Sequence, residues 1–246
     1  MSANALPLFD LNPDLDRRKL AGAFAPSRRV QIRNLLTERA AEVLADVVQR
    51  QTPYGLAFRE PGATPQSIRA DAARALPAAR HNQIWQSAGA AVGRGEYGFV
   101  YAQYPMLDAY LQHWSPGNPL ELLLEHINAE PFLDLVRTVT GVPELIKADA
   151  QATLFAPNHF LSVHDDRGGH DEARRIAYVL GLTRDWRPDW GGYLTFFDDE
   201  DEVVAGFKPR FNCLNLFEVP QRHSVTFVPP FAPVGRFAIT GWFRDR

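Results

Sequence analysis

The chain has 246 residues, of which 46% are hydrophobic and 22% charged, a composition that suits a globular protein with a sizeable core. Its formal net charge of −3 argues against a general nucleic-acid-binding protein, because phosphate contacts need clustered positive charge. The single cysteine, Cys213, excludes an intramolecular disulfide and a cysteine-based zinc site, and its apolar neighbours predict a buried side chain.

The N-terminal residues 1–9 have neither a basic leader nor the long apolar stretch of a signal peptide. No segment approaches the ~20 apolar residues that are needed to cross a bilayer. We therefore expect a cytoplasmic protein with no membrane partner. The length is compatible with one domain, 1–246, and no coiled-coil heptad predicts an oligomeric state.

The first half of the chain predicts mostly helices. Residues 29–33 alternate polar and apolar side chains, as in a short strand, and Thr37 is expected to cap the helix that follows. Residues 55–95 could form a lid, a substrate wall or a plain surface excursion. The further expected elements are a helix over 67–81, a strand over 97–104, and two helices that begin at Asn118-Pro119 and at Pro131, the second ending at Gly141.

The second half changes to short strands separated by turns. About eight strands in about one hundred residues predict a barrel or jelly roll. The expected strands are 146–155, 160–166, 175–183, 192–198, 203–207, 211–219, 223–228 and 236–243. The fold class is therefore α+β, mainly β, with residues 1–145 as a helical support and possible lid and 146–246 as the β-roll that holds the site.

The run His164-Asp165-Asp166 is the main candidate for chemistry. Side chains i and i+2 of a strand point to the same face, so His164 and Asp166 can reach one metal while Asp165 points away. A histidine from a distant strand, His223, would complete three ligands on one side of the ion. Two histidines and one carboxylate form the facial triad of non-haem Fe(II) oxygenases.

Other interpretations of these residues remain open at this point. A His-x-Asp triplet occurs by chance in many proteins, and a buried strand histidine is usually only hydrogen-bonded. His159, in the turn before the strand, and His170, in a glycine-containing loop, could each be a ligand together with His164.

Arg236 opens the final apolar strand of the sequence. An arginine that points into a barrel is costly unless an anion pairs with it, and a guanidinium binds a carboxylate through two hydrogen bonds. Arg236 could therefore bind a dicarboxylate cosubstrate, although a surface arginine at a strand start is the simpler alternative. Thr240 lies on the same strand face and could line the same pocket, or be an ordinary strand threonine.

These residues resemble those of the Fe(II)/2-oxoglutarate dioxygenases, in particular the prolyl 4-hydroxylase-like branch with the ribosomal-protein and hypoxia-factor prolyl hydroxylases. The resemblance covers about residues 150–246. It is carried, in order, by Ser162-Val163-His164-Asp165-Asp166, by Arg174-Arg175-Ile176-Ala177-Tyr178-Val179-Leu180, by Trp190-Gly191-Gly192-Tyr193-Leu194, by Leu216-Phe217-Glu218-Val219, by His223-Ser224-Val225, and by Arg236-Phe237-Ala238-Ile239-Thr240-Gly241-Trp242-Phe243.

The resemblance implies a double-stranded β-helix in which His164, Asp166 and His223 bind iron and Arg236 holds the distal carboxylate of 2-oxoglutarate. It implies Fe(II), 2-oxoglutarate and O₂ as cofactors, with ascorbate as an optional reductant, and no catalytic residue beyond the metal ligands. Several relatives place a tyrosine on the strand after the His-x-Asp motif, where this chain has Gly181, so the cosubstrate pocket could be roomier. Tyr178 is a nearby candidate to bind the cosubstrate instead.

The expected reaction is hydroxylation of a C–H bond, since the carboxylate Asp166 disfavours halogenation. A prolyl residue of a protein or peptide is the first substrate to consider, and a free amino acid or other small molecule the second. A third interpretation is a catalytically silent binding or regulatory β-roll. A cupin-like metal protein that uses no 2-oxoglutarate is also conceivable, but it would have no need for Arg236.

Overall fold

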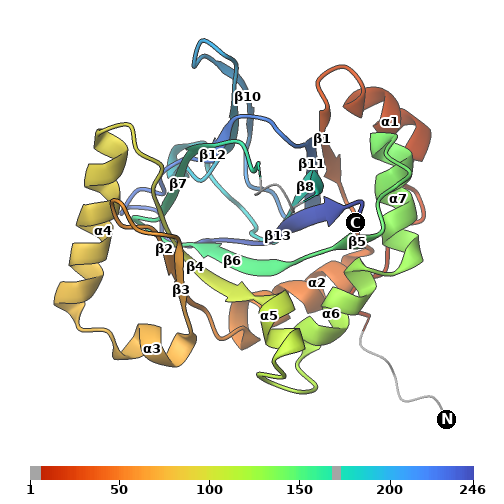
Figure 1. Ribbon diagram of the computed structural model, residues 1–246. Coiled ribbons are helices and arrows are strands. Elements are labelled where there is room, and N and C mark those ends of the chain that lie inside the picture. The colour runs from red at the N-terminus through yellow and green to blue at the C-terminus, as the bar shows by residue number, and fades with distance from the viewer. Residues whose placement is uncertain (1–6, 168–172) are drawn as a thin grey trace.

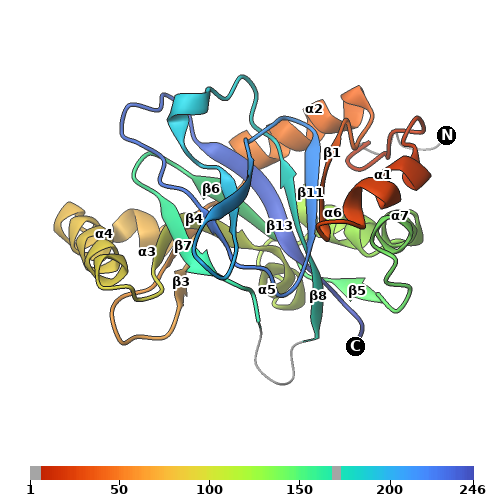
Figure 2. The ribbon, with the colours of Figure 1, turned by 90° about the horizontal axis from the view of Figure 1, so that it is seen from above.

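A barrel-like roll of antiparallel strands, flanked by helices on two sides, dominates the computed structural model, which describes residues 7–167 and 173–246 (Figures 1 and 2). Its strands are β1 (Arg29–Arg33), β2 (Gly55–Phe58), β3 (Gln66–Ile68), β4 (Phe99–Pro105), β5 (Lys147–Ala148), β6 (Gln151–Phe155), β7 (Phe160–His164), β8 (Arg174–Gly181), β9 (Leu194–Phe197), β10 (Val203–Phe207), β11 (Cys213–Glu218), β12 (His223–Val225) and β13 (Arg236–Arg244).

The helices come mainly from the first half of the chain. They are α1 (Arg17–Phe24), α2 (Glu38–Asp46), α3 (Ala70–Ala75), α4 (Ala78–Gly93), α5 (Met106–Leu111), α6 (Pro119–Ile127) and α7 (Glu130–Thr140), together with the π-helical turn η1 (Val47–Gln51) and the 3₁₀ turn η2 (Pro188–Trp190). No helix of the described residues is long and apolar enough to span a membrane.

The strands follow the order β1-β11-β8-β13-β6-β4-β7-β12-β9-β10, and every pairing is antiparallel. The roll turns at β4, which pairs with β6 along its second half and with β7 along its first. The sheet thereby folds back on itself into a roll (Figure 1). Residues of both halves line a cavity inside it. This is the jelly-roll arrangement expected from the strand pattern.

Helices α1, α2, α6 and α7 lie on one side of the roll, and their apolar faces form the largest core cluster with β8, β11 and β13 (Figure 2). Along each of these strands alternate residues face the helices, as the two-residue period of a strand requires. Ile176, Tyr178 and Leu180 of β8 and Ile239 of β13 belong to this outer layer. Their neighbours in sequence face the interior of the roll, where the candidate site lies.

The expected strand over 146–155 is divided into β5 and β6 because the Asp149 side chain enters the ladder. Its Oδ1 accepts a hydrogen bond from the Trp242 backbone N–H at 2.9 Å. Its Oδ2 accepts from the Arg244 guanidinium at 2.5 and 3.2 Å. Pairing with β13 resumes on either side of this interruption.

The helical support expected over residues 1–145 is only part of what this half contributes, because it also provides four strands of the sheet. The predicted helix over 67–81 is wrong in its bounds. β3 occupies its start and Pro77 separates α3 from α4.

Of residues 55–95 only Pro65 lines the central cavity. Helix α4 packs on β2 and β4 through Ile84 and Ala88, so this region braces the sheet rather than covering the site.

Several local predictions are confirmed by hydrogen bonds and backbone angles. The Thr37 hydroxyl accepts from the Ala40 N–H at the start of α2, and the Asn118 side chain accepts from the Leu120 N–H at the start of α6. Gly141 ends α7 with a φ of 70°, a left-handed conformation that costs glycine little.

Candidate metal centre

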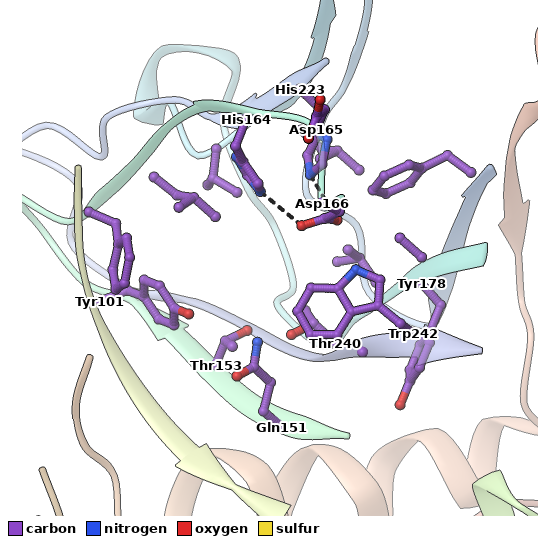
Figure 3. Close-up of a pocket in the computed structure, with 18 of the residues that line it drawn as sticks. Tyr101, Gln151, Thr153, His164, Asp165, Asp166, Tyr178, His223, Thr240 and Trp242 are labelled. Carbon is purple, nitrogen blue, oxygen red and sulfur yellow. Dashed lines mark ion pairs between the residues drawn. The ribbon is translucent and has the colours of Figure 1, made fainter. Parts of the chain in front are cut away.

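Two histidines and an aspartate from distant parts of the sequence meet inside the roll (Figure 3). His164 ends β7 and His223 begins β12, and the two are paired in the ladder with ring centroids 4.1 Å apart. One ligand atom from each of His164, Asp166 and His223 lies within 4.8 Å of the others. Within 7–167 and 173–246 this is the one group of three or more potential ligands.

Asp166 lies beside the two histidines, but not as a strand residue on the same face as His164, which was the prediction. β7 ends at His164, so Asp166 is not its strand neighbour two residues on. Its φ of 61° is left-handed, and this turn swings the carboxylate back beside the two imidazoles. Asp165 turns toward Arg167, with which it forms an ion pair at 2.9 Å.

The hydrogen bonds of the histidines fix which nitrogen is free to bind a metal. His164 Nδ1 lies 2.9 Å from the Ser162 carbonyl oxygen, and His223 Nδ1 lies 2.8 Å from the Gln221 carbonyl oxygen. Because a carbonyl oxygen only accepts, both Nδ1 atoms must carry the proton. Both Nε2 atoms then present lone pairs toward Asp166, at 3.2 and 3.4 Å from its two oxygens. This donor set fits Fe(II).

The electrostatics of the site favour an ionised Asp166 carboxylate and a neutral His223 imidazole. Burial opposes ionisation of Asp166, but the adjacent His164 and the nearby His223 outweigh it and lower the pKa of the carboxyl to about 2. Burial, with a contribution from His164, lowers the pKa of His223 to about 4. At neutral pH Asp166 and His223 are therefore in the forms that coordinate a cation.

The alternative histidine ligands are not brought to this site. The ring of His159 is held in its own turn, where Nδ1 accepts from the Ala156 N–H at 3.1 Å. Burial lowers the pKa of this imidazole. His170 lies outside the described residues.

A cavity of about 580 Å³ extends from the triad into the roll, and Arg236 lies in its wall. The Arg236 side chain is buried, with 4% of the residue exposed, and burial lowers its pKa to about 10. Its guanidinium lies 5.2 Å from the Phe155 ring centroid. It forms no ion pair with any carboxylate of residues 7–167 and 173–246. The surface-arginine alternative is therefore wrong.

Thr240 shares the inward face of β13 with Arg236, as the strand period predicts. Its hydroxyl oxygen is buried and has no hydrogen-bond partner among the described residues. A buried hydroxyl without a partner is costly, so the cavity contains both a cation and a hydroxyl that a polar ligand would satisfy.

Tyr178 is not brought to this end of the cavity. Its ring belongs to the outer core layer, 5.1 Å from the Phe243 ring, and its hydroxyl donates to the Asp149 carbonyl oxygen at 2.8 Å (Figure 3). Tyr178 borders the cavity, but its ring packs toward the helices and its hydroxyl is already engaged, so a role in cosubstrate binding stays a prediction. Gly181 does not enlarge the pocket either, since a Cβ at this position would lie 2.3 Å from the Arg210 carbonyl oxygen.

Four polar or aromatic residues that the sequence did not single out also line the cavity: Tyr101, Gln151, Thr153 and Trp242 (Figure 3). Burial raises the pKa of Tyr101 to about 12, so its hydroxyl is a donor at neutral pH. The one feature of the sequence that could have identified them is the two-residue period of the strands. Trp242 is two residues beyond Thr240 on the same strand, and Gln151 and Thr153 alternate on β6 opposite β13.

Comparisons with known proteins agree with this geometry. Residues 150–244 match the family described as the 2OG-Fe(II) oxygenase superfamily. A stretch of 127 residues, 49% of this chain, is 29% identical to prolyl 3-hydroxylase OGFOD1 of Xenopus laevis and covers 24% of that protein. The chain thus spans about a quarter of the length of the curated relatives that it matches.

Two solved structures show the same fold over nearly the whole chain. One is a Pseudomonas putida prolyl-4-hydroxylase, with a TM-score of 0.54, 19% identity, and coverage of 94% of this chain and 99% of the other. The second is a Trichoplax adhaerens prolyl hydroxylase in complex with a hypoxia-inducible-factor peptide fragment. It has a TM-score of 0.60, 16% identity, and coverage of 93% and 89%. The roll is therefore a double-stranded β-helix.

Proposed function

We propose, because this chain belongs to the 2OG-Fe(II) oxygenase superfamily, that it is an Fe(II)- and 2-oxoglutarate-dependent dioxygenase that hydroxylates a prolyl residue of a protein or peptide. One observation carries the proposal. The His164, Asp166 and His223 donor set and the buried guanidinium of Arg236, which has no ion-pair partner among the described residues, open into the same cavity. A metal protein that uses no dicarboxylate has no reason to maintain such a cation.

Each group of the site has a distinct part in this function. The two imidazoles and the carboxylate would hold Fe(II), which when bound supplies the activation of O₂ coupled to decarboxylation of 2-oxoglutarate. Arg236 would bind the far carboxylate of the cosubstrate through charge-assisted hydrogen bonds, and the Thr240 hydroxyl would donate to the same molecule. The apolar walls, including Phe155 and Leu194, exclude water from the reacting groups.

The prolyl substrate is supported by the relatives, whose names identify them as prolyl hydroxylases. The alternative of a free amino acid or other small molecule would be favoured by an enclosed pocket beneath residues 55–95. That region contributes only Pro65 to the cavity wall, which favours the peptide. A catalytically silent β-roll is disfavoured because both the donor set and Arg236 are intact.

Three further expectations belong to the same proposal. Residues 1–246 would act as a single oxygenase domain, which is supported by the pairing of β1 with β11 and of β4 with β6 and β7. Ascorbate would act as a reductant, to be tested by its effect on the number of turnovers. A cytoplasmic location stays a prediction, which fractionation of cells would test.

The test is succinate formation from 2-oxoglutarate under air with added Fe(II), in the absence of a prime substrate. We expect slow turnover that disappears in His164→Ala and that weakens at limiting 2-oxoglutarate in Arg236→Met. His159→Ala is the matched control, because this histidine lies outside the triad, and it should keep the activity. Absence of turnover together with absence of Mn²⁺ and 2-oxoglutarate binding in the wild type would overturn the proposal.

The substrate class is tested separately with proline-containing peptides and with free L-proline. Gain of one oxygen atom by a peptide, detected by mass spectrometry and dependent on 2-oxoglutarate, is the expected result. Oxidation of free proline alone would replace the peptide by the small-molecule alternative.

A further inference from the structure

Asp166 is the one member of the triad that no strand holds in place. His164 and His223 are fixed by the ladder between β7 and β12, but Asp166 lies two residues past the end of β7 in a left-handed turn. A carboxylate on a turn can rotate unless other groups hold it. Carboxylates that bind metals in proteins are usually held by hydrogen bonds from a surrounding layer of residues.

Trp242 is the residue best placed to provide such a hydrogen bond. It lies on the inward face of β13, and its indole nitrogen points toward the Asp166 carboxylate (Figure 3). This nitrogen is fully buried and meets no acceptor in full hydrogen-bond geometry among the described residues, yet it lies near enough to Asp166 to contribute to the lowered pKa of that carboxyl. A buried N–H without an acceptor is destabilising, so its position next to a metal-ligand carboxylate requires an explanation.

Two contacts hold Trp242 in this orientation, and a third ties the Asp166 turn to the same arginine. The Arg174 guanidinium lies 4.0 Å from the ring centroid, over one face of the indole. Arg174 Nη1 also donates to the Asp166 carbonyl oxygen at 3.5 Å, which ties the turn to the same arginine. On the backbone side, the Trp242 N–H donates to Asp149 Oδ1 at 2.9 Å. The tryptophan is therefore anchored at its backbone and on its ring face, with its N–H edge turned toward Asp166.

We propose that Trp242 is a positioning residue for the metal centre, whose indole N–H donates a hydrogen bond to the Asp166 oxygen that does not bind the metal. This inference rests on the proposed function, in which one Asp166 oxygen binds iron. The inference gives a partner to the second oxygen. This division of roles between the two Asp166 oxygens has a chemical reason. A carboxylate has two oxygens, and a single N–H donor on one of them directs the other toward the two Nε2 atoms.

The first test compares metal affinity in Trp242→Phe and in Trp85→Phe. Phenylalanine keeps an aromatic ring under Arg174 but removes the N–H. Trp85 is the matched control, since its indole N–H donates to the carbonyl oxygen of Asn158, which precedes the start of β7, whereas His164 lies at the end of that strand. From the usual effect of such outer hydrogen bonds, we expect Mn²⁺ to bind Trp242→Phe about 10 to 100-fold more weakly, and Trp85→Phe like the wild type.

Free Mn²⁺ measured by electron paramagnetic resonance gives the affinity without any turnover. Equal Mn²⁺ affinity of wild type and Trp242→Phe would overturn the assignment of Trp242 and leave the oxygenase proposal intact. A wild-type protein that does not bind Mn²⁺ would instead overturn the proposed function. The two failures are therefore distinguishable.

A second measurement uses the wild-type protein and does not depend on the folding of a variant. Nitrogen-15 spectra report the indole N–H groups of the five tryptophans. We expect one signal to move downfield when Zn²⁺ is added, as its N–H gains an acceptor, and the same signal to be broadened most by Mn²⁺. If no indole signal moves on saturation with Zn²⁺, the hydrogen bond does not form and the proposal is wrong.

Discussion

His164 and His223 are direct partners in the antiparallel ladder between β7 and β12, and their imidazole rings stand 4.1 Å apart. This pairing explains how two residues so far apart in sequence act as one unit. The ladder fixes the distance between the strands, and the register fixes which side chains oppose each other. The segment between them can therefore vary in length without moving either imidazole, provided that the register is kept.

The first prediction concerns the free energy cost of Arg236. Its guanidinium is buried without an ion-pair partner among the described residues, and burial lowers its pKa to about 10. Arg236→Met keeps most of the buried stem and removes the charge. In urea denaturation without ligand, we expect the variant to be as stable as the wild type or more stable by ~1–3 kcal/mol.

The same variant should lose its response to the cosubstrate. With Mn²⁺ present, 2-oxoglutarate should raise the melting temperature of the wild type and have little effect on Arg236→Met, because a ligand stabilises the state that it binds. Mn²⁺ alone should stabilise both proteins equally. An Arg236→Met protein that is markedly less stable without ligand would show that the arginine is structural.

The second prediction is that Gly181 is required by packing and not by the cosubstrate. A Cβ at position 181 would lie 2.3 Å from the Arg210 carbonyl oxygen, so Gly181→Ala must push two backbone segments apart. We expect a loss of ~1–3 kcal/mol in the free energy of unfolding measured with urea.

Gly89→Ala is the control for this substitution, because a Cβ there has no neighbour within 4 Å and the residue lies inside α4. Alanine should stabilise that helix by ~0.5–1 kcal/mol. If Gly181→Ala were as stable as the wild type but bound 2-oxoglutarate differently, position 181 would belong to the cosubstrate pocket after all.

The third prediction concerns the reactivity of the single thiol. Cys213 lies on β11 with 1% of the residue exposed, and burial raises its pKa to about 12. A thiol of this kind is almost entirely protonated at pH 8, and the thiolate is the reactive form. The folded protein should therefore not react with an aromatic disulfide reagent at pH 8, whereas the urea-unfolded protein should react with one equivalent. Fast reaction in native buffer would contradict the placement of β11.

The fourth prediction is a pH dependence of stability that originates at His159. Burial lowers the pKa of this imidazole in the folded protein, so the unfolded state binds a proton more readily. The stabilisation is therefore complete above the unfolded pKa of about 6.5 and is lost as the pH falls from there toward the folded pKa. Protonation would also remove the acceptor of the Ala156 N–H.

The measurement is the free energy of unfolding of wild type and His159→Gln at several pH values between 5 and 8. We expect the difference between the two proteins to shrink as the pH falls. A constant difference would mean that His159 does not change its protonation between the folded and unfolded states in this range.

Much of the roll could be predicted from sequence because its turns are marked and its strands are short. The strands containing His164, His223 and Arg236 were all expected, and the caps at Thr37 and Asn118 follow from local chemistry that does not depend on the rest of the fold. The double-stranded β-helix itself rested on resemblance, since a pattern of strands alone does not determine their order.

What could not be predicted depends on contacts between distant segments. β8 is buried on both faces, so its sequence does not reveal that Tyr178 faces the helices while its neighbours face the cavity. The left-handed turn that turns Asp166 back toward the site is a product of tertiary packing. The interruption at Asp149 arises from a hydrogen bond to Trp242, far along the chain.

The place of β13 between β8 and β6 has a consequence for how the protein acquires its structure. β13 is the last strand in sequence, yet it pairs with both β6 and β8 and joins them in the sheet. The roll therefore cannot close before residues 236–244 have been synthesised. Until then β6 and β8 each present an unpaired edge, which is a template for aggregation. Most of these contacts are also distant in sequence, which slows folding. Nascent chains arrested before Arg236 should therefore depend on chaperones far more than chains that already contain β13.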